Sequence, residues 1–245
     1  MRTTIKRLLL LLLPLLGTTA MGAQKSDTFK TRSGRDVVIT HIKHATMQIS
    51  YDGKTIYVDP VIKLKPETDY SDYPKGDYIF VTHEHADHFD PIALSQLRHD
   101  ATVVVANPSV SEKLHYGMTM KNGDHFTLSD DIEVWAVPAY NTTAGREQFH
   151  PKGRDNGYVL QIDGLRIYIA GDTEDIAEMA TLENIDVAFL PCNQPYTMTV
   201  DQLVRAAKTF RPKVLFPYHY SQTPVSQVLM KLMGSGIEVR IRDYQ

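Results

Sequence analysis

Cysteine is nearly absent from this chain, and basic residues are not in excess. Cys192 is the only cysteine among 245 residues, which excludes an intramolecular disulfide. The chain has 26 lysine and arginine residues against 29 aspartate and glutamate residues, which gives a formal net charge of −3. Because nucleic acids and anionic membrane surfaces attract basic proteins, this balance argues against both as partners. Cys192 follows an apolar stretch, so we expect a buried thiol at a strand end.

Two common signatures of enzyme sites are also missing. The sequence contains neither a Gly-x-Ser-x-Gly nucleophile motif nor a phosphate-binding loop of the P-loop type. It therefore gives no support to a serine hydrolase or a P-loop nucleotidase, and any catalytic chemistry must be sought in other residues.

The first 23 residues differ in character from the rest of the chain. Arg2, Lys6 and Arg7 precede an apolar stretch over residues 8–16, and small residues follow around positions 20–23. This order is typical of a secretory signal peptide, and the apolar stretch is short for a membrane span. We expect residues 1–23 to be removed, which leaves one domain over residues 24–245 in a secreted, periplasmic protein without a stable membrane anchor. An uncleaved N-terminal anchor is the alternative.

Short apolar runs rich in β-branched and aromatic residues recur along the chain. Asp52-Gly53 and Asp163-Gly164 each separate two such runs and predict tight hairpin turns. Hairpins come first, and strands that alternate with helices follow. This order predicts an α/β fold in which two β-sheets pack face to face with helices outside. The expected strands cover residues 37–40, 46–51, 55–58, 78–81, 102–106, 132–137, 158–162, 165–170, 187–190, 214–217 and 237–241.

Four helices are expected between these strands. Thr199 and Gln202 have the spacing of a capping box at the start of one of them. Gly117 is expected to end a second helix, and Thr223 to open the last. The expected helices cover residues 91–98, 109–116, 201–210 and 224–233.

A dense group of metal-binding side chains follows one predicted strand. Residues 78–81 read as a buried strand, and His83, His85, Asp87 and His88 come directly after it. Imidazole and carboxylate groups suit zinc and its divalent neighbours. Residues two apart on an extended segment point the same way, so His83 and His85 can share one ion. Asp87 and His88 can serve a second.

The same loop also carries residues with simpler explanations. Asp90 precedes a helical pattern that begins at Pro91, so we expect it to cap that helix. Capping explains Asp90 but leaves the three closely spaced histidines unexplained. Glu84 would point away from its neighbours on an extended segment, so it is a better candidate for supporting a ligand than for being one.

The spacing His-x-His-x-Asp-His at residues 83–88 resembles the signature of the metallo-β-lactamase superfamily of di-metal hydrolases. The resemblance extends to Asp172 and His219 and covers about residues 36–245. Within the superfamily, Val58-Asp59-Pro60 and residues 167–173 look like the branch that contains the ascorbate-6-phosphate lactonase. The resemblance implies the metallo-β-lactamase fold, a four-layer αββα sandwich of two mixed β-sheets flanked by helices.

The resemblance also implies two metal ions that share one aspartate. His44 matches a recurring family position near the cleft and is a candidate for contact with a ligand. The implied ligands are His83 and His85 for the first ion, Asp87, His88 and His219 for the second, and Asp172 as the bridge.

One histidine of the family pattern is missing from its usual place. Many relatives complete the first site with a histidine where this chain has Tyr140 and Asn141, and His150 is the best substitute. A solvent-exposed loop histidine is the other interpretation of His150, and the first site would then be weak. Taken alone, Asp172 could be a turn residue or helix cap, and His219 could be packed among aromatic neighbours.

Two divalent ions would supply hydroxide near neutral pH by lowering the pKa of a water held between them. We expect zinc, with iron or manganese as alternatives. The predicted activity is hydrolysis of a small ester-like bond, with a water held by Asp87 as one possible acid for the leaving oxygen. Lactone and phosphodiester substrates come ahead of β-lactams because of the branch resemblance. Tyr140, Asn141, Tyr196, Tyr218 and Tyr220 could line the pocket, although tyrosines at strand ends more often pack.

Two other functions stay open. His and Asp ligands also suit iron, so redox chemistry at a di-iron site is one of them, although no flavin-binding domain follows the predicted sandwich. The other is metal binding without turnover, which the missing histidine near Tyr140 motivates.

Overall fold

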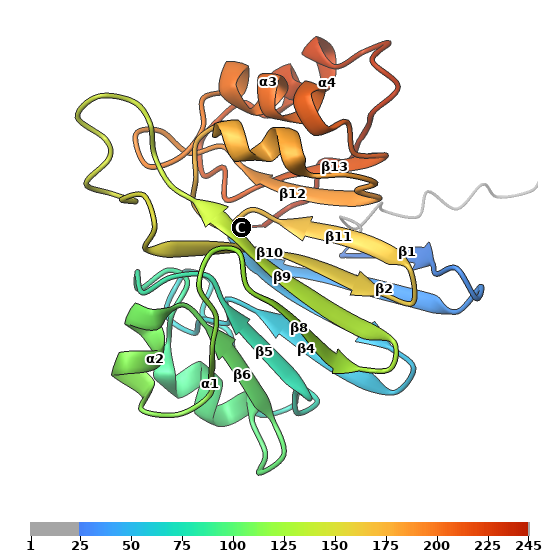
Figure 1. Cartoon of the computed structure of the whole chain (residues 1–245), viewed down its shortest axis with the longest axis vertical. Coiled ribbons are helices and arrows are strands. Elements are labelled where there is room, and N and C mark those ends of the chain that lie inside the picture. The colour runs from blue at the N-terminus through green and yellow to red at the C-terminus, as the bar shows by residue number, and fades with distance from the viewer. Residues whose placement is uncertain (1–24, 245) are drawn as a thin grey trace, which may run out of the picture.

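Two mixed β-sheets of seven strands each form the body of the protein (Figure 1). The computed structural model describes residues 25–244, so the predicted signal peptide lies outside the described residues. Between residues 25 and 244, no helix has the length and apolar character needed to cross a membrane. In both sheets the first strands of the set pair antiparallel and the later strands pair parallel.

The first sheet holds the strands from the first half of the chain in sequence order, β1 to β7. Its strands are β1 Ser26–Lys30, β2 Asp36–Lys43, β3 Thr46–Tyr51, β4 Lys54–Val58, β5 Tyr78–Val81, β6 Val103–Ala106 and β7 Met118–Thr119. The second sheet holds the rest, β8 to β14, also in sequence order. Its strands are β8 His125–Ser129, β9 Ile132–Ala139, β10 Asp155–Ile162, β11 Leu165–Ile169, β12 Val187–Pro191, β13 Val214–Tyr218 and β14 Glu238–Val239.

The predicted hairpin turns are confirmed. Asp52 and Gly53 both have positive φ, 47° and 75°, and they join Tyr51 to its partner Lys54. Asp163 and Gly164 show the same pattern, with φ of 44° and 79°. Positive φ at both central residues matches the right-handed twist of the flanking strands, which is why Asp-Gly is favoured there.

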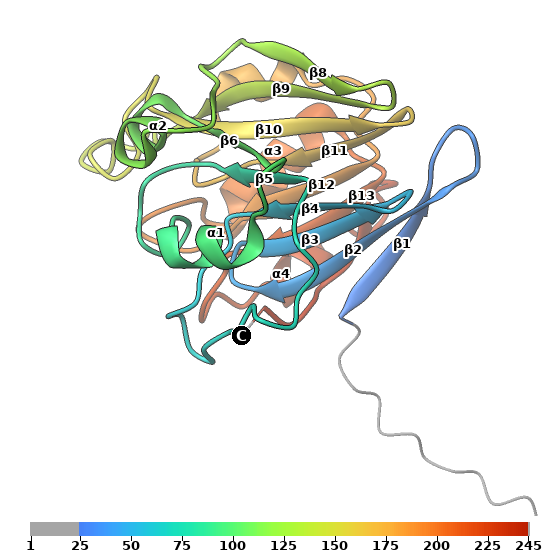
Figure 2. The same ribbon diagram turned by 90° about the horizontal axis from the view of Figure 1, so that it is seen from below.

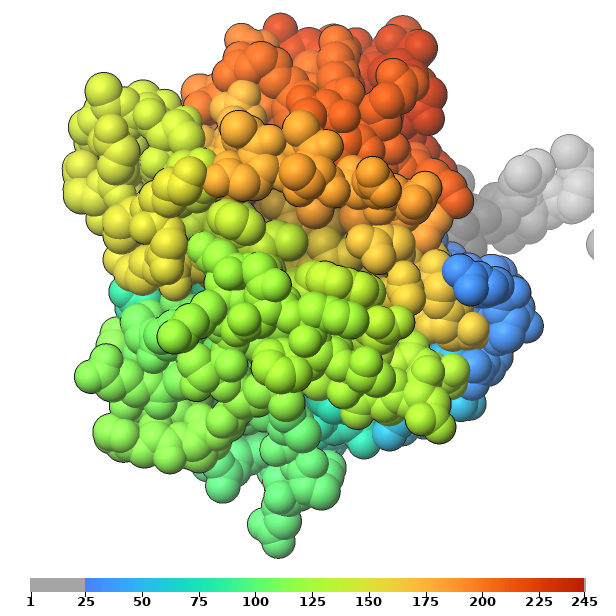
Figure 3. All heavy atoms as spheres, viewed as in Figure 1, coloured from blue at the N-terminus to red at the C-terminus, as the bar shows by residue number. Residues whose placement is uncertain are grey.

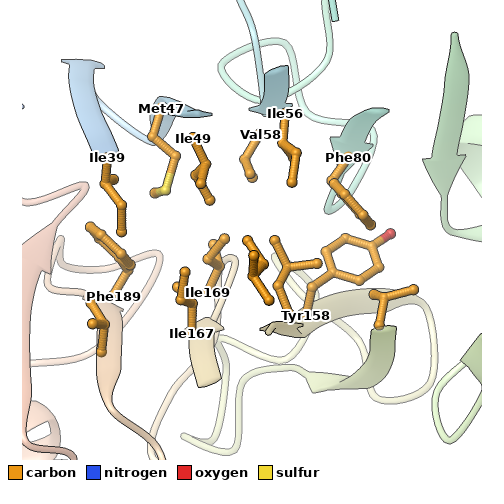
Figure 4. Packing of buried hydrophobic residues seen from close by; sticks show 14 of the residues in the cluster. Ile39, Met47, Ile49, Ile56, Val58, Phe80, Tyr158, Ile167, Ile169 and Phe189 are labelled. Carbon is orange, nitrogen blue, oxygen red and sulfur yellow. The ribbon is translucent and has the colours of Figure 1, made fainter. Parts of the chain in front are cut away.

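The main core lies between the two sheets. β5 is buried along its whole length, with Tyr78 and Phe80 facing the other sheet and Ile79 and Val81 facing the helices. This two-sided burial explains its uninterrupted apolar sequence. In Figure 4, side chains of the first sheet meet those of the second across a single layer: Ile39, Met47, Ile49, Ile56, Val58 and Phe80 against Tyr158, Ile167, Ile169 and Phe189.

Helices cover the outer face of each sheet. The helices α1 and α2, from the first half of the chain, pack on the first sheet through a separate apolar cluster. The helices η1, α3 and α4, from the second half, pack on the second sheet through another. Figure 1 shows α3 and α4 at the top and α1 and α2 at the lower left, and Figure 2 gives the same layers from below. The predicted four-layer αββα sandwich is confirmed. The helices are α1 Pro91–Leu97, α2 Pro108–Leu114, η1 Ala177–Thr181, α3 Val200–Phe210 and α4 Ser226–Lys231.

The predicted capping residues are confirmed at the start of two helices, whereas the predicted end of one helix and the predicted start of another were wrong. Asp90 caps α1, and Thr199 with Gln202 forms the predicted capping box of α3. The second helix was expected to run to residue 116, but it ends at Leu114 because His115 takes the left-handed conformation, with φ of 58°. The last helix was expected to open at Thr223. Instead Thr223 accepts the backbone N–H of Val225 through its carbonyl, and no side chain caps α4.

A buried ionic cluster ties β1 to the last described residues. Asp27 is 2% exposed and accepts hydrogen bonds from Arg242 at 2.6 and 2.8 Å and from Arg240 at 3.0 Å. His41 lies 2.8 Å from Asp27 and 3.0 Å from the hydroxyl of Tyr244. Burial would raise the pKa of Asp27, but the bonds from Arg242 and His41 outweigh it and lower that pKa. β1 was not predicted, because its one fully buried position holds a carboxylate.

Candidate metal centre

The seven predicted ligands come together at one edge of the sandwich. Each follows or precedes the end of a rigid strand: His83 follows β5, Asp172 follows β11, and His219 follows β13. His150 precedes β10, which runs antiparallel to β11 and therefore begins at the edge where β11 ends. Long stretches of chain separate the donors at residues 83–88 from His150, Asp172 and His219, and the packing of the two sheets brings them together.

The donor atoms form two neighbouring groups, which a third group of His83, His88 and Asp172 joins. In the first, ring nitrogens of His83, His85 and His150 lie within 4.8 Å of one another. In the second, donors from Asp87, His88 and His219 lie within the same distance and include His44. This division matches the two ligand sets that the family resemblance implies.

Asp172 lies between the two groups. Its Oδ2 is 3.4 Å from Nε2 of His150 in the first group and 3.3 Å from Nε2 of His219 in the second. Its Oδ1 is 3.2 Å from Nε2 of His88. One carboxylate therefore faces both groups, which is the position required of a bridging ligand.

Buried atoms without hydrogen-bond partners point into this space. Among the described residues, Nε2 of His88, Nε2 of His150 and Oδ1 of Asp172 are buried and make no well-directed hydrogen bond, although the two imidazoles lie 3.2 and 3.4 Å from the Asp172 carboxylate. Each such atom costs about 1–3 kcal/mol unless something binds it. The opposite nitrogens are held: Nδ1 of His88 lies 2.8 Å from Asp59, and Nδ1 of His150 lies 2.9 Å from Asp155.

A carboxylate behind His88 and another behind His150 fix these two rings so that the free nitrogen of each faces the centre. This is the usual arrangement of metal-binding histidines. The donor set therefore fits a pair of divalent cations.

The charges of the centre are strongly coupled. Burial lowers the pKa of His83 well below its usual value. Burial would raise the pKa of Asp172, but His219 and His88 outweigh it and hold that pKa well below the usual range. For His150, burial is outweighed by the neighbouring carboxylates of Asp155 and Asp172, which raise the pKa to about 9. Cations and protons thus compete for the same nitrogens, so metal affinity should fall as the pH falls.

Comparison with known proteins identifies the family. A family model described as "Beta-lactamase superfamily domain" matches residues 38–219. The chain belongs to this superfamily. The resemblance of the His-x-His-x-Asp-His motif is therefore confirmed at superfamily level, while the lactonase-like branch stays a prediction.

Relatives in the superfamily cover most of the chain. A UPF0173 metal-dependent hydrolase of Ligilactobacillus salivarius is 34% identical over 76% of this chain and 86% of its own. A crystal structure from Parabacteroides distasonis, assigned as a metal-dependent hydrolase, is 51% identical with a TM-score of 0.88, over 91% of this chain and all of the other. Igni18, a metallo hydrolase of Ignicoccus hospitalis, is 27% identical with a TM-score of 0.72, over 84% and 95% of the two chains.

The loop between β9 and β10 places His150 near residues 140 and 141, where many relatives were expected to carry a ligand histidine. The backbone N–H of Asn141 donates to the carbonyl of His150 at 2.8 Å. This bond closes residues 142–149 into a loop that projects from the body of the molecule, yellow-green in Figures 1 and 3. His150 therefore lies beside Asn141. Tyr140 is not at the centre, since its hydroxyl bonds to Glu178 at 2.8 Å.

Three further residues hold the predicted ligands or the side chains behind them. Nε2 of His44 lies 3.1 Å from Asp87, and its ring lies 3.8 Å from that of His219. Glu84 points away from the centre, as expected, and pairs with Arg154 at 3.3 Å. Arg154 in turn holds Asp155, the carboxylate behind His150, at 2.7 Å.

Asp59 is the supporting residue whose role the sequence did not reveal. It is fully buried, and its Oδ1 accepts the backbone N–H of Thr82 at 2.8 Å. Its Oδ2 lies 2.7 Å from the hydroxyl of Thr82 and 2.8 Å from Nδ1 of His88. In the sequence it belonged only to the Val58-Asp59-Pro60 resemblance, because no local pattern links it to a histidine 29 residues later.

Asp59→Asn is expected to weaken metal binding about tenfold to hundredfold while leaving the fold intact. Asparagine has one acceptor oxygen and a donor amide, so it cannot accept from Thr82 and His88 as the carboxylate does. The affinity should be measured by competition with a chromogenic chelator. Asp36→Asn is the control, since Asp36 pairs with Lys30 on the surface. Equal affinities in the two variants would contradict this role.

An open cleft of about 420 Å³ exposes the centre to solvent. Of the residues expected to line it, Tyr196 does so, whereas Tyr218 is fully buried and Tyr220 bonds through its hydroxyl to the carbonyl of Arg242. Cys192 is buried in the outer core, as expected, and burial raises the pKa of its thiol to about 12. The cleft is lined by His85, Asp87, Phe149, His150, Asp172, Asn193, Tyr196 and His219.

Proposed function

We propose that the protein is a metal-dependent hydrolase that uses two divalent cations to cleave a small ester-like bond. The observation that carries this proposal is the position of Asp172, whose carboxylate lies within 3.4 Å of donors from both groups at the base of an open cleft. The hydrolase names of the relatives agree with it. In this proposal the first ion is held by His83, His85 and His150, the second by Asp87, His88 and His219, and both by Asp172.

When bound, such a pair of cations, most simply zinc, supplies Lewis acidity and lowers the pKa of water toward neutrality. The residues of the chain set the geometry for this chemistry. Asp59 and Asp155 hold His88 and His150 through their Nδ1 atoms, so that each ring presents Nε2 to the centre. Because these rings are buried against the strand ends, they cannot turn away when a substrate enters.

Asp87 is the carboxylate of the centre that also meets solvent. Its side chain is 35% exposed, compared with 4% for that of Asp172, and it lines the cleft. Burial would raise its pKa, but the hydrogen bonds from His219 and His44 lower the pKa well below the usual range. Asp87 therefore stays ionised. As an acceptor it can hold a water that passes a proton to the leaving oxygen.

Metal analysis combined with a substrate panel tests the proposal. The purified protein is loaded with zinc, manganese or iron, its metal content is measured, and hydrolysis of lactones, phosphodiesters and thioesters is followed. We expect two ions per chain and metal-dependent hydrolysis of at least one class. Two ions without turnover of any ester would instead support a metal-binding protein. Bound iron with oxygen reduction would support the redox function.

A further inference from the structure

Two aromatic rings form one wall of the cleft. Phe149, from the loop before β10, and Tyr196, from the loop after β12, pack edge to face with ring centroids 5.0 Å apart. Both line the cleft, and Tyr196 is 45% exposed. These two rings place exposed apolar surface beside a polar centre. Such a surface is typical of a ligand-binding site.

The wall is fixed by the amide of Asn141. Its Nδ2 donates to the carbonyl of Tyr196 at 2.8 Å and to the carbonyl of Arg146 at 3.2 Å. It thereby joins the loop that carries Phe149 to the loop that carries Tyr196. The backbone N–H of Tyr196 also donates to the carbonyl of Asn193 at 3.0 Å. A surface held in place before binding loses less entropy when a ligand arrives.

Positive side chains near the centre already have partners. Among the described residues that line the cleft there is no lysine or arginine. Arg146, on the same loop as Phe149, bonds to Gln194 and faces Glu174 at 3.9 Å. A second cavity, of about 250 Å³, shares His44 with the centre and is lined by Lys43 and Lys65, and Lys65 pairs with Glu67 at 2.6 Å. The ammonium of Lys43 donates to three backbone carbonyls, at 2.7, 2.9 and 3.1 Å.

We propose that the Phe149–Tyr196 wall binds an uncharged planar or apolar group of the substrate, so that the substrates are neutral carboxylic esters and lactones. Beyond the proposed metal pair, the cleft offers a charged substituent no lysine or arginine, so the part of the substrate outside the reacting bond is expected to be uncharged. A neutral ester places only its carbonyl at the centre and its apolar part on the rings. Hydrolysis then adds one water across the acyl C–O bond and turns a lactone into a single hydroxy acid. This inference rests on the proposed function.

Matched lactones test the inference. Two lactones with the same ring carry either a phenyl group or a carboxylate at the same carbon, and kcat/KM is measured for the metal-loaded protein. We expect the phenyl lactone to be preferred. Phe149→Ala and Tyr196→Ala should each reduce that preference about tenfold, mainly through KM, and Tyr196→Phe should retain it. Phe126→Ala removes an exposed ring on β8 and should change nothing. A preference for the carboxylate lactone, or wall variants with unchanged preference, would overturn the inference.

A binding measurement separates this inference from the proposed function. A cyclic ketone with the same phenyl substituent cannot be hydrolysed, and its affinity for the metal-loaded protein is measured by calorimetry. Weaker binding to Phe149→Ala and Tyr196→Ala, but not to Phe126→Ala, supports the wall even if no ester is turned over. If the protein shows metal-dependent hydrolysis but binds the ketone equally well with or without the two wall residues, the proposed function is supported and this inference is contradicted.

Discussion

Asp172→Ala is expected to abolish hydrolysis and to leave the protein with one bound ion or none. Asp172 is the only described carboxylate within 3.5 Å of both His150 and His219, so its loss separates the two donor groups. Losing the metal pair removes several kcal/mol of transition-state stabilisation, which corresponds to about a thousandfold or more in kcat/KM. Metal content per chain and kcat/KM on the best ester of the panel are the two measurements.

The control for this variant lies three residues further on. Asp175 pairs with Arg205 at 2.8 Å, where the arginine side chain is 60% exposed, and it is not among the donors of the centre. Asp175→Ala should therefore keep two ions and normal activity. If Asp172→Ala kept both ions, or if the two variants lost activity alike, Asp172 would not be a bridging ligand.

His150→Ala is expected to remove one ion selectively. It leaves His83 and His85 as the only histidines of the first group, while the second group keeps Asp87, His88 and His219. The first site would then keep only His83, His85 and the shared Asp172 in place of four side chains, so its affinity should fall by about a hundredfold or more. Titration of the metal-free protein should then show one tight site in place of two, with hydrolysis reduced in parallel.

His125→Ala provides the matched histidine variant. His125 lies on β8, bonds to Glu133 at 2.9 Å and stacks on Trp135. Its removal should leave both sites intact. Two tight sites in His150→Ala would show that His150 is a structural loop residue, which is the other interpretation left open by the sequence.

The part of the site that residue type and spacing could predict lies in one short segment of the sequence, residues 83–88. The donors from His83 to His88 follow an apolar strand within a few residues, so residue type and spacing were enough to indicate a metal site. Asp172 and His219 needed the family resemblance, because a single residue after a strand has several ordinary explanations. The structure brings these residues together, while their binding of metal stays a prediction.

Supporting roles were expected for His44 and Glu84, whereas the role of Asp59 could not be predicted because its partner is distant in sequence. Asp59 contacts His88 across 29 residues, and nothing in the residues around Asp59 specifies that contact. The wall depends on Asn141 reaching Tyr196, 55 residues away. In the fold, β1 and β8 were missed for a related reason. Strand patterns are recognised by buried apolar residues, whereas β1 buries Asp27 and β8 has no fully buried residue.

The cluster around Asp27 has a consequence for the order in which the protein folds. Tyr244, held in that cluster, accepts the backbone N–H of His44 at 2.6 Å, and the carbonyl of His44 accepts the N–H of His219. Two histidines at the centre thus take their backbone positions from Tyr244, at the end of the described residues. Contacts this far apart in sequence form late, because long loops must close first. Cation uptake should therefore come late in folding, and a chain that lacks Tyr244 should form both sheets but leave His44 and His219 without this backbone support.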